Sequence, residues 1–482
     1  MPKLSKLLLT TVLSFVLGGL SLASPALANH SQVTYFEANQ LLLSSATRPA
    51  TIAQLKRLGV HALRVELYWV DVAPGAGSAT KPKFDATNPA NYAWGDYDAL
   101  LNEAARLHWQ VLLTVTSPAP RWATSNKKAP YITRPDPKDF QEFMTAVGRH
   151  YAGLVSAFSV WNEPNHPAFL LPQWNSNGTP ASPRIYRGLY QAAIEGLKAA
   201  GLGSAKVLFG ETAPTGYDSV KSLIRTEHSK AFVHDVAPLA FLRTALCLNA
   251  HYRKSGSCSL LPMAGYAHHA YTLPAGPRYV DPVRDDVTLG ALSRLSAALD
   301  KAAAAHAIPG HVPIYLTEFG VQSKPNKYLG VPVAQQAEYD ALAEQIAWSN
   351  PRVVAFSQYL LKDDPVGGAP GASVHGGVVG FQTGLEYVNG RAKPLYAAWP
   401  VPLVVSGRHS FSLWGLIRPA SGATTLTVLA RLKGSKSYRT VKNVSTNSLG
   451  YWALHTSVHA QFFRVRWTSP EGVRYEGPPI KA

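Results

Sequence analysis

The chain has 482 residues, 46% of them hydrophobic and 16% charged, and carries a formal net charge of +17 at pH 7. This composition excludes a disordered or fibrous chain and is typical of a folded protein of two or more domains. The positive charge permits an anionic partner, such as an acidic polysaccharide or the cell envelope, or serves solubility alone. The basic residues form no run interleaved with aromatic ones, so we expect no nucleic-acid partner.

The first 28 residues have the pattern of a secretory signal peptide. Lys3 and Lys6 precede an apolar run, and a small-x-small motif ends at Ala28, where we expect cleavage. An uncleaved membrane anchor is the alternative. No later stretch is long and apolar enough to span a bilayer. We therefore expect a secreted protein without membrane insertion, either free or associated with the cell wall, that acts as a monomer.

Short strand-like runs alternate with helix-period stretches between residues 32 and 400. We expect eight strands, at 33–38, 62–69, 110–117, 155–162, 206–212, 265–271, 313–320 and 353–361. Such alternation over this length predicts a closed (β/α)8 TIM barrel, which we assign to residues 29–401. The alternative is an open doubly wound sheet, but no Gly-rich phosphate loop follows the first strand.

The chain has two cysteines, Cys247 and Cys258. In an exported protein, an even pair at short separation predicts one local disulfide. Two free thiols are the alternative. A metal site is disfavoured because two cysteines without matching partners do not complete a tetrahedral shell.

Residues 402–482 have a different texture, with short alternating runs separated by Gly, Ser and Asn turns. This pattern predicts a small all-β sandwich as an accessory domain. Its tryptophans Trp414, Trp452 and Trp467 lie in strand-like runs, and we interpret them as core residues rather than as platforms for sugar rings.

Two acidic residues follow apolar strands, Glu163 after the fourth and Glu318 after the seventh. Catalytic groups of TIM barrels lie where the strands end at the carboxyl face, so we expect these two carboxyls to face each other across the mouth. Paired carboxylates are what cleavage of a glycosidic bond requires. One must be protonated and the other ionised, which different surroundings can arrange.

The segments WNEPN (161–165) and LTEFG (316–320) resemble the acid/base and nucleophile motifs of glycoside hydrolase clan A, which includes family 5 and family 39. The stretch 32–400 is similar to a group of exported actinobacterial proteins described as cellulase-like. The resemblance implies a retaining β-glycosidase in which Glu163 is the acid/base and Glu318 the nucleophile.

Further residues match the clan's pattern. Arg64 resembles the second-strand arginine that supports the nucleophile, and Asn162 resembles the asparagine that binds the sugar 2-hydroxyl. His269 and Tyr271 resemble the sixth-strand His-x-Tyr pair, whose tyrosine holds the nucleophile and whose histidine lines the cleft. For each of these residues, a purely structural role is the alternative.

Other residues are expected to contact substrate. Trp69 and Trp122 follow the second and third strands and would offer flat faces to a sugar ring, with core packing as the alternative. Glu211 and Gln358, at the ends of the fifth and eighth strands, would line the cleft. The eighth strand lacks the tryptophan usual in family 5, so Phe381, Trp69 or Trp122 would have to replace it.

The sequence thus predicts hydrolysis of β-glycosidic bonds in a polysaccharide or oligosaccharide, neutral or anionic, through a covalent intermediate. A transglycosylase with the same site and a non-catalytic carbohydrate-binding or cell-wall protein are the alternatives. The sequence contains no HExxH or GxSxG motif, and we expect no metal and no cofactor.

Overall fold

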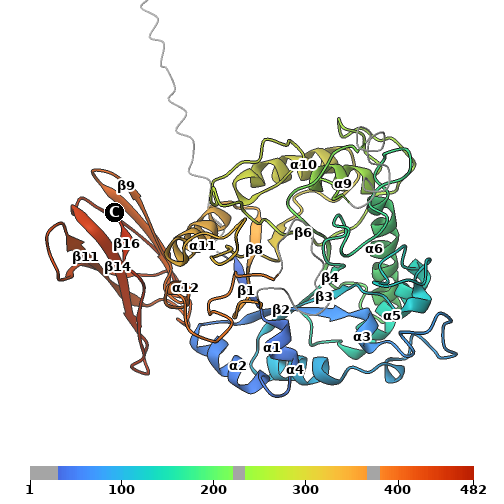
Figure 1. Cartoon of the computed structure of the whole chain (residues 1–482), viewed down its shortest axis with the longest axis horizontal. Helices are drawn as coiled ribbons and strands as arrows, with labels where there is room; N and C mark the ends of the chain where they lie inside the picture. Colours follow the sequence, from blue (N-terminus) through green and yellow to red (C-terminus); the bar gives the residue numbers. More distant parts are fainter. Residues whose placement is uncertain (1–30, 221–233, 366–379) are drawn as a thin grey trace, which may run out of the picture.

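The computed structural model describes residues 31–220, 234–365 and 380–482. Eight parallel strands form a closed barrel, each paired with the next along the chain and the eighth with the first (Figure 1). They are β1 (Val33–Glu37), β2 (Ala62–Tyr68), β3 (Gln110–Thr116), β4 (Ala157–Val160), β5 (Val207–Thr212), β6 (Gly265–His268), β7 (Ile314–Leu316) and β8 (Val353–Tyr359). The predicted TIM barrel is confirmed. The predicted signal peptide lies outside the described residues.

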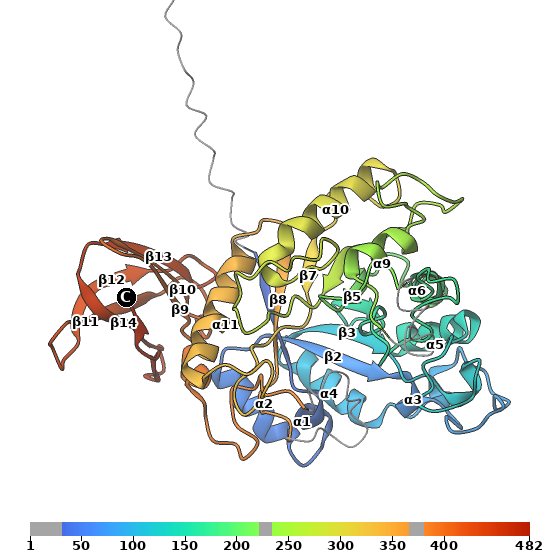
Figure 2. The same cartoon turned by 45° about the horizontal axis from the view of Figure 1, so that its top comes forward.

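Helices surround the barrel (Figure 2). They are α1 (Asn39–Leu43), α2 (Arg48–Arg57), α3 (Trp69–Val72), α4 (Gly95–Arg106), α5 (Pro137–His150), α6 (Ser182–Ala199), α9 (Pro238–Ala245), α10 (Leu292–Ala304), α11 (Val333–Trp348) and α12 (Pro394–Ala398). Short 3-10 turns lie at Pro89–Asn91, Arg121–Ala123 and Leu289–Ala291. The apolar sides of these helices and the outward side chains of the strands form one large core.

Local sequence explains how these helices begin and pack, as α5 illustrates. The Asp136 side chain accepts hydrogen bonds from backbone N–H groups of the first turn, and Pro137 takes the first helical position, where its missing N–H costs nothing. On the neighbouring helix α6, Gly196 permits a close approach. A Cβ there would lie 2.5 Å from the carbonyl oxygen of Gln141 in α5.

The last 80 residues form two antiparallel sheets. The strands are β9 (Leu403–Gly407), β10 (Phe411–Leu416), β11 (Thr425–Leu432), β12 (Arg439–Ser445), β13 (Tyr451–Thr456), β14 (Ala460–Thr468), β15 (Arg474–Glu476) and β16 (Ile480–Lys481). One sheet has the order β13-β10-β9, and the other has the order β12-β11-β14-β15 with β16 also paired to β14. Apolar side chains between the sheets form a separate core, which confirms the predicted sandwich. The boundary near residue 402 remains a prediction.

The three-stranded sheet packs against α11 of the barrel. Trp414 contacts Trp348 with ring centroids 5.5 Å apart. Arg418, just after β10, makes a two-pronged ion pair with Glu344 of α11 at 3.0 and 2.8 Å, and its guanidinium lies 3.7 Å from the Trp399 ring centroid. Trp414 is buried at this junction, and Trp452 and Trp467 are buried in the sandwich core. Their interpretation as core residues is therefore confirmed.

A disulfide joins Cys247 to Cys258, as predicted. It closes the loop between α9 and β6. Within the three described ranges, no helix has both the length and the apolar character needed to cross a membrane.

Candidate active site

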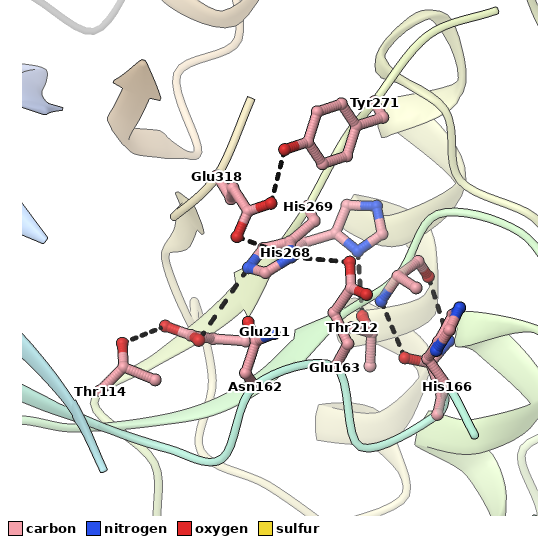
Figure 3. A network of polar contacts seen from close by, with 12 residues as sticks. Thr114, Asn162, Glu163, His166, Glu211, Thr212, His268, His269, Tyr271 and Glu318 are labelled. Carbon is pink, nitrogen blue, oxygen red and sulfur yellow. Dashed lines mark hydrogen bonds and ion pairs between the residues drawn. The ribbon is translucent and has the colours of Figure 1, made fainter. Parts of the chain in front are cut away.

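Glu163 and Glu318 lie at the carboxyl end of the barrel, just beyond β4 and β7 (Figure 3). The chain leaves β4 through two non-glycine residues in the left-handed region, Trp161 with φ 67° and Glu163 with φ 36°. The backbone N–H of Trp161 donates to the Val115 carbonyl, and that of Glu163 donates to the Glu211 carbonyl. Bonds to the two neighbouring strands thus hold an unfavourable backbone in place, a pattern found at active sites.

One histidine contacts both carboxyls. His269 Nδ1 lies 2.9 Å from Glu163 Oε1 and 3.6 Å from Glu318 Oε2. The Tyr271 hydroxyl donates to the other Glu318 oxygen at 2.5 Å. Figure 3 shows the two carboxyls on either side of the imidazole. His269 and Tyr271 lie just past β6, so the structure brings four predicted residues from three strand ends together.

Arg64 is at the centre of the cluster and is fully buried. Its guanidinium donates to Glu318 Oε2 at 3.1 Å and to Glu211 Oε2 at 2.7 Å. It also pairs with Glu37 and lies 3.6 Å from Glu66. These carboxylates raise the pKa of Arg64, although burial alone would lower it. One guanidinium therefore serves four carboxylates.

Burial separates the protonation states of the acids. It raises the pKa of Glu163 to about 8, and Glu66 and Glu211 add to this effect while Arg64 opposes it. Burial also raises the pKa of Glu318, against the opposing effects of His269 and Arg64. For Glu211, the burial penalty is exceeded by Arg64, and its pKa is lowered. At neutral pH, Glu163 is therefore protonated.

Asn162 is oriented by two bonds. Its backbone N–H donates to the Thr116 hydroxyl at 2.8 Å, and its Oδ1 accepts from Arg64 at 2.9 Å. Among the described residues, no hydrogen bond is made by its amide nitrogen. This side chain therefore keeps two N–H donors beside the two carboxyls, where a sugar hydroxyl would lie.

Two predicted substrate contacts, Glu211 and Gln358, are completely buried among protein groups in the structure. Glu211 accepts a hydrogen bond from Arg64 and another from the Thr114 hydroxyl at 2.8 Å. It therefore holds the Arg64 guanidinium in position. Gln358 donates to the carbonyl oxygens of Thr383 and Leu360, which ties β8 to the following loop.

The predicted tryptophan platforms are also buried. Trp69 is stacked on Phe143 of α5, with centroids 5.2 Å apart and planes 7° apart, and packs edge-on against Trp122. Neither indole offers a free face, because the apolar surface between strands and helices encloses both. The third candidate, Phe381, is half-buried and has its ring 6.3 Å from that of Tyr271. Through Tyr271, which bonds Glu318, this ring lies near the two facing carboxyls.

Sequence reasoning missed Glu37 and Glu66, both buried acids of the cluster. Glu37 is the last residue of β1. An acidic residue at the end of a predicted strand is the sequence feature that could have identified it. Glu66 lies two residues after Arg64 on β2, so both side chains point to the same side of the strand. The sequence feature that could have indicated this cluster is an arginine and a glutamate two residues apart, Arg64 and Glu66, within an otherwise apolar strand.

The comparisons with known proteins find no matching family model and no matching curated protein. Several solved structures are similar in fold. A glucosidase from Croceicoccus marinus has a TM-score of 0.49 and 10% identity, covering 89% of this chain and 93% of that one. A β-glucosidase from Pyrococcus furiosus has a TM-score of 0.44 and 13% identity, covering 77% and 94%. Xylanase 10B from Thermotoga maritima has a TM-score of 0.40 and 14% identity, covering 77% and 94%. Likeness at this level carries no argument about activity, which must come from the site itself.

Proposed function

We propose that this protein is a retaining β-glycosidase that acts on a polysaccharide or oligosaccharide. The observation that carries the proposal is the contact of Glu163 and Glu318 with the same nitrogen of His269. The two contacting oxygens cannot be farther apart than the sum of those two distances. Carboxyls are about 5–5.5 Å apart in retaining glycosidases and about 6.5–9.5 Å apart in inverting ones, which need room for a water. This upper bound does not exceed the shortest separation of inverting enzymes, and it therefore favours retention.

The surroundings of the pair assign their roles. Arg64 and Tyr271 each donate to one oxygen of Glu318, and donors of this kind stabilise the ionised form that a nucleophile requires. Glu163, with a pKa of about 8, has the proton that a general acid must give up. Arg64 and Tyr271 are positioning residues in this scheme, because they act through the Glu318 carboxylate.

In the first step, a Glu318 oxygen forms a bond to the anomeric carbon while the glycosidic C–O bond breaks and Glu163 gives its proton to the leaving oxygen. In the second step, water attacks the same carbon, its proton passes to the Glu163 carboxylate, and the bond to Glu318 breaks. Asn162 donates to the 2-hydroxyl of the sugar, where hydrogen bonds strengthen in the transition state. Configuration is retained after two inversions.

The charge of the site constrains the sugar at the cleaved bond. Four glutamates lie around one arginine, and a fifth, Glu163, contacts His269. Burial lowers the pKa of His269, so the imidazole is neutral at neutral pH. A carboxylate on the bound sugar would lie near acids whose single counter-ion is already shared. We therefore propose that the sugar ring bound between Glu163 and Glu318 is neutral, even if the polymer has acidic residues elsewhere.

Two substitutions test the roles. Glu163→Gln and Glu318→Gln keep the size of the side chain and remove the titrating group, and each is expected to lower kcat by about a thousandfold or more on neutral β-linked oligosaccharides. Glu471→Gln, on the exposed β14–β15 turn, is the matched control and should retain full activity. Near-normal turnover in either active-site variant would contradict the roles proposed for Glu163 and Glu318.

A further inference from the structure

The outer face of the five-stranded sheet gathers basic and aromatic residues that are scattered in the sequence. Side chains alternate along β11 and β14, so that one set enters the sandwich core and the other points outward. We call the outward-pointing side chains of β11 and β14, together with neighbouring side chains from the β11–β12 turn and from β15, the arginine face. It consists of Arg431, Tyr438, Phe462, Arg464, Arg466, Arg474 and Glu476.

These side chains form a continuous ladder. The Arg431 guanidinium lies 4.5 Å from the Phe462 ring centroid and 5.9 Å from that of Tyr438. The Arg464 guanidinium lies 4.9 Å from the same Tyr438 ring. Stacking on aromatic rings holds a guanidinium flat and limits its rotamers, so less entropy is lost when it binds a ligand.

One carboxylate already lies at the end of this ladder. Glu476 accepts from Arg464 at 2.6 Å and from Arg466 at 2.9 Å, and it also pairs with Arg474. Partial burial acts to raise its pKa, but the three guanidiniums outweigh this and hold the pKa at about 2. The face therefore shows the geometry with which it takes a carboxylate, and three positive charges there meet one negative charge.

The positive charge of the face is not balanced by acids. In the part of the chain that the structure describes, Arg431 makes no ion pair with an acidic side chain, and its guanidinium is stacked on aromatic rings instead. Residues 402–482 contain eleven Lys and Arg against two Glu, a formal charge of +9, more than half of the +17 of the whole chain. This excess creates a positive field that an anionic polymer would neutralise.

The arginine face points away from the catalytic barrel. The three-stranded sheet uses its outer side to contact α11, and the five-stranded sheet forms the far layer of the sandwich (Figures 1 and 2). The four arginines are half-buried or exposed, with side-chain exposures of 26%, 37% and 57% for Arg464, Arg466 and Arg474. A ligand can reach them without entering the barrel mouth.

We propose that the arginine face binds a linear polysaccharide that carries carboxylate groups, and so holds the enzyme on an acidic glycan matrix. Guanidinium forks match carboxylates in a two-pronged manner, and Glu476 provides the example on the face itself. The half-buried rings of Tyr438 and Phe462 add apolar surface of the kind that packs against sugar rings. This site is separate from the acid-rich mouth, where we propose that a neutral sugar binds. Binding at the face requires no hydrolysis.

The test is a calorimetric titration of the full chain with polygalacturonate at about 50 mM salt. The matched ligand is fully methyl-esterified polygalacturonate, which has the same backbone without the charges. We expect binding of the charged polymer that weakens as salt rises, and no binding of the ester. Equal binding of both polymers, or no binding of the charged one, would overturn the proposal.

Variants locate the site. Arg431→Gln/Arg464→Gln is expected to weaken binding of polygalacturonate about tenfold or more. Arg431→Lys/Arg464→Lys keeps the charge and loses the fork, so its affinity should be intermediate. Lys56→Gln/Arg408→Gln removes two exposed charges elsewhere and should bind within about twofold of the unsubstituted protein. Equal affinities of all four proteins would contradict the assignment to this face.

Two further ligands identify the class of polymer. Inorganic polyphosphate and a DNA duplex of equal total charge are titrated under the same conditions. The proposal requires both to bind more weakly than polygalacturonate. Tighter binding of either would overturn it in favour of a phosphate polymer or a nucleic acid. Turnover of a short neutral substrate should be the same in the arginine-face variants as in the unsubstituted protein, which separates this site from the proposed active site.

Discussion

The barrel mouth and the outer face of the sandwich each contain a cluster of glutamates and arginines, but acids are in excess in the first cluster and arginines in the second. At the mouth, one arginine, Arg64, meets four carboxylates and is completely buried. On the arginine face, one carboxylate, Glu476, meets three arginines that remain in contact with solvent. The same glutamate–arginine chemistry thus has different consequences, because water is excluded at one place and present at the other.

The pKa values of two glutamates measure that difference. Burial raises the pKa of Glu163 to about 8, as its proposed role as a proton donor requires. At the solvent-exposed cluster, three hydrogen-bonding arginines outweigh the burial effect and lower the pKa of Glu476 to about 2. An unpaired charge is costly inside a protein and inexpensive at its surface. This difference fits the catalytic role that we propose for the first cluster and the binding role that we propose for the second.

The largest effect is expected from Arg64→Gln. This substitution leaves buried carboxylates without their counter-ion, so it should lower the free energy of unfolding by about 3–5 kcal/mol and abolish turnover. Arg474→Gln on the arginine face should change the free energy of unfolding by less than about 1 kcal/mol. Urea denaturation of both variants gives the comparison. Equal losses of stability would contradict the contrast between the two clusters.

The pH dependence of activity sharpens the contrast further. Glu163 must be protonated to act as the acid, so kcat/KM should fall about tenfold for each pH unit above about 8. Because burial raises the pKa of Glu318, the fall on the acid side should begin above the usual range of a glutamate. The Glu163→Gln variant should retain some activity on an aryl glycoside whose good leaving group needs no proton. The kcat/KM of this residual activity should no longer fall as the pH rises above about 8. Persistence of that fall would assign it to another group.

The smallest effect is expected from Glu476→Gln. Removing this carboxylate frees three arginines that remain solvated, so the free energy of unfolding should fall by less than about 1 kcal/mol. Affinity for polygalacturonate should rise slightly, by about twofold, because the face gains one net positive charge. Titration calorimetry measures the change. Weaker binding in this variant would mean that Glu476 is needed to hold the arginines in their binding positions.

Much of this architecture could be predicted from the sequence. The eight strands, the change of texture after residue 402 and the disulfide follow from patterns with local physical causes. The closeness of Glu163 to Glu318 follows from barrel closure, since each acid comes directly after a buried strand. Their chemical roles remain predictions.

The errors concern contacts that depend on packing. Trp69 follows its strand as a sugar platform would, but it is drawn into an aromatic cluster with Phe143 that lies about 75 residues away in sequence. Glu211 is the next-to-last residue of β5, where a substrate contact could lie, but it is buried and bonds Arg64. The arginine face also escaped prediction, because its basic residues come from three strands and form a surface only through the register of the sheet.

The most direct test of the central claim is the configuration of the first product. Proton NMR follows the anomeric signals while the enzyme cleaves neutral β-linked oligosaccharides, before mutarotation mixes the two forms. We predict that the β-anomer appears first, as double displacement through Glu318 requires. If the α-anomer appears first, the reaction inverts configuration, Glu318 acts as a base toward water, and the proposed covalent intermediate is wrong.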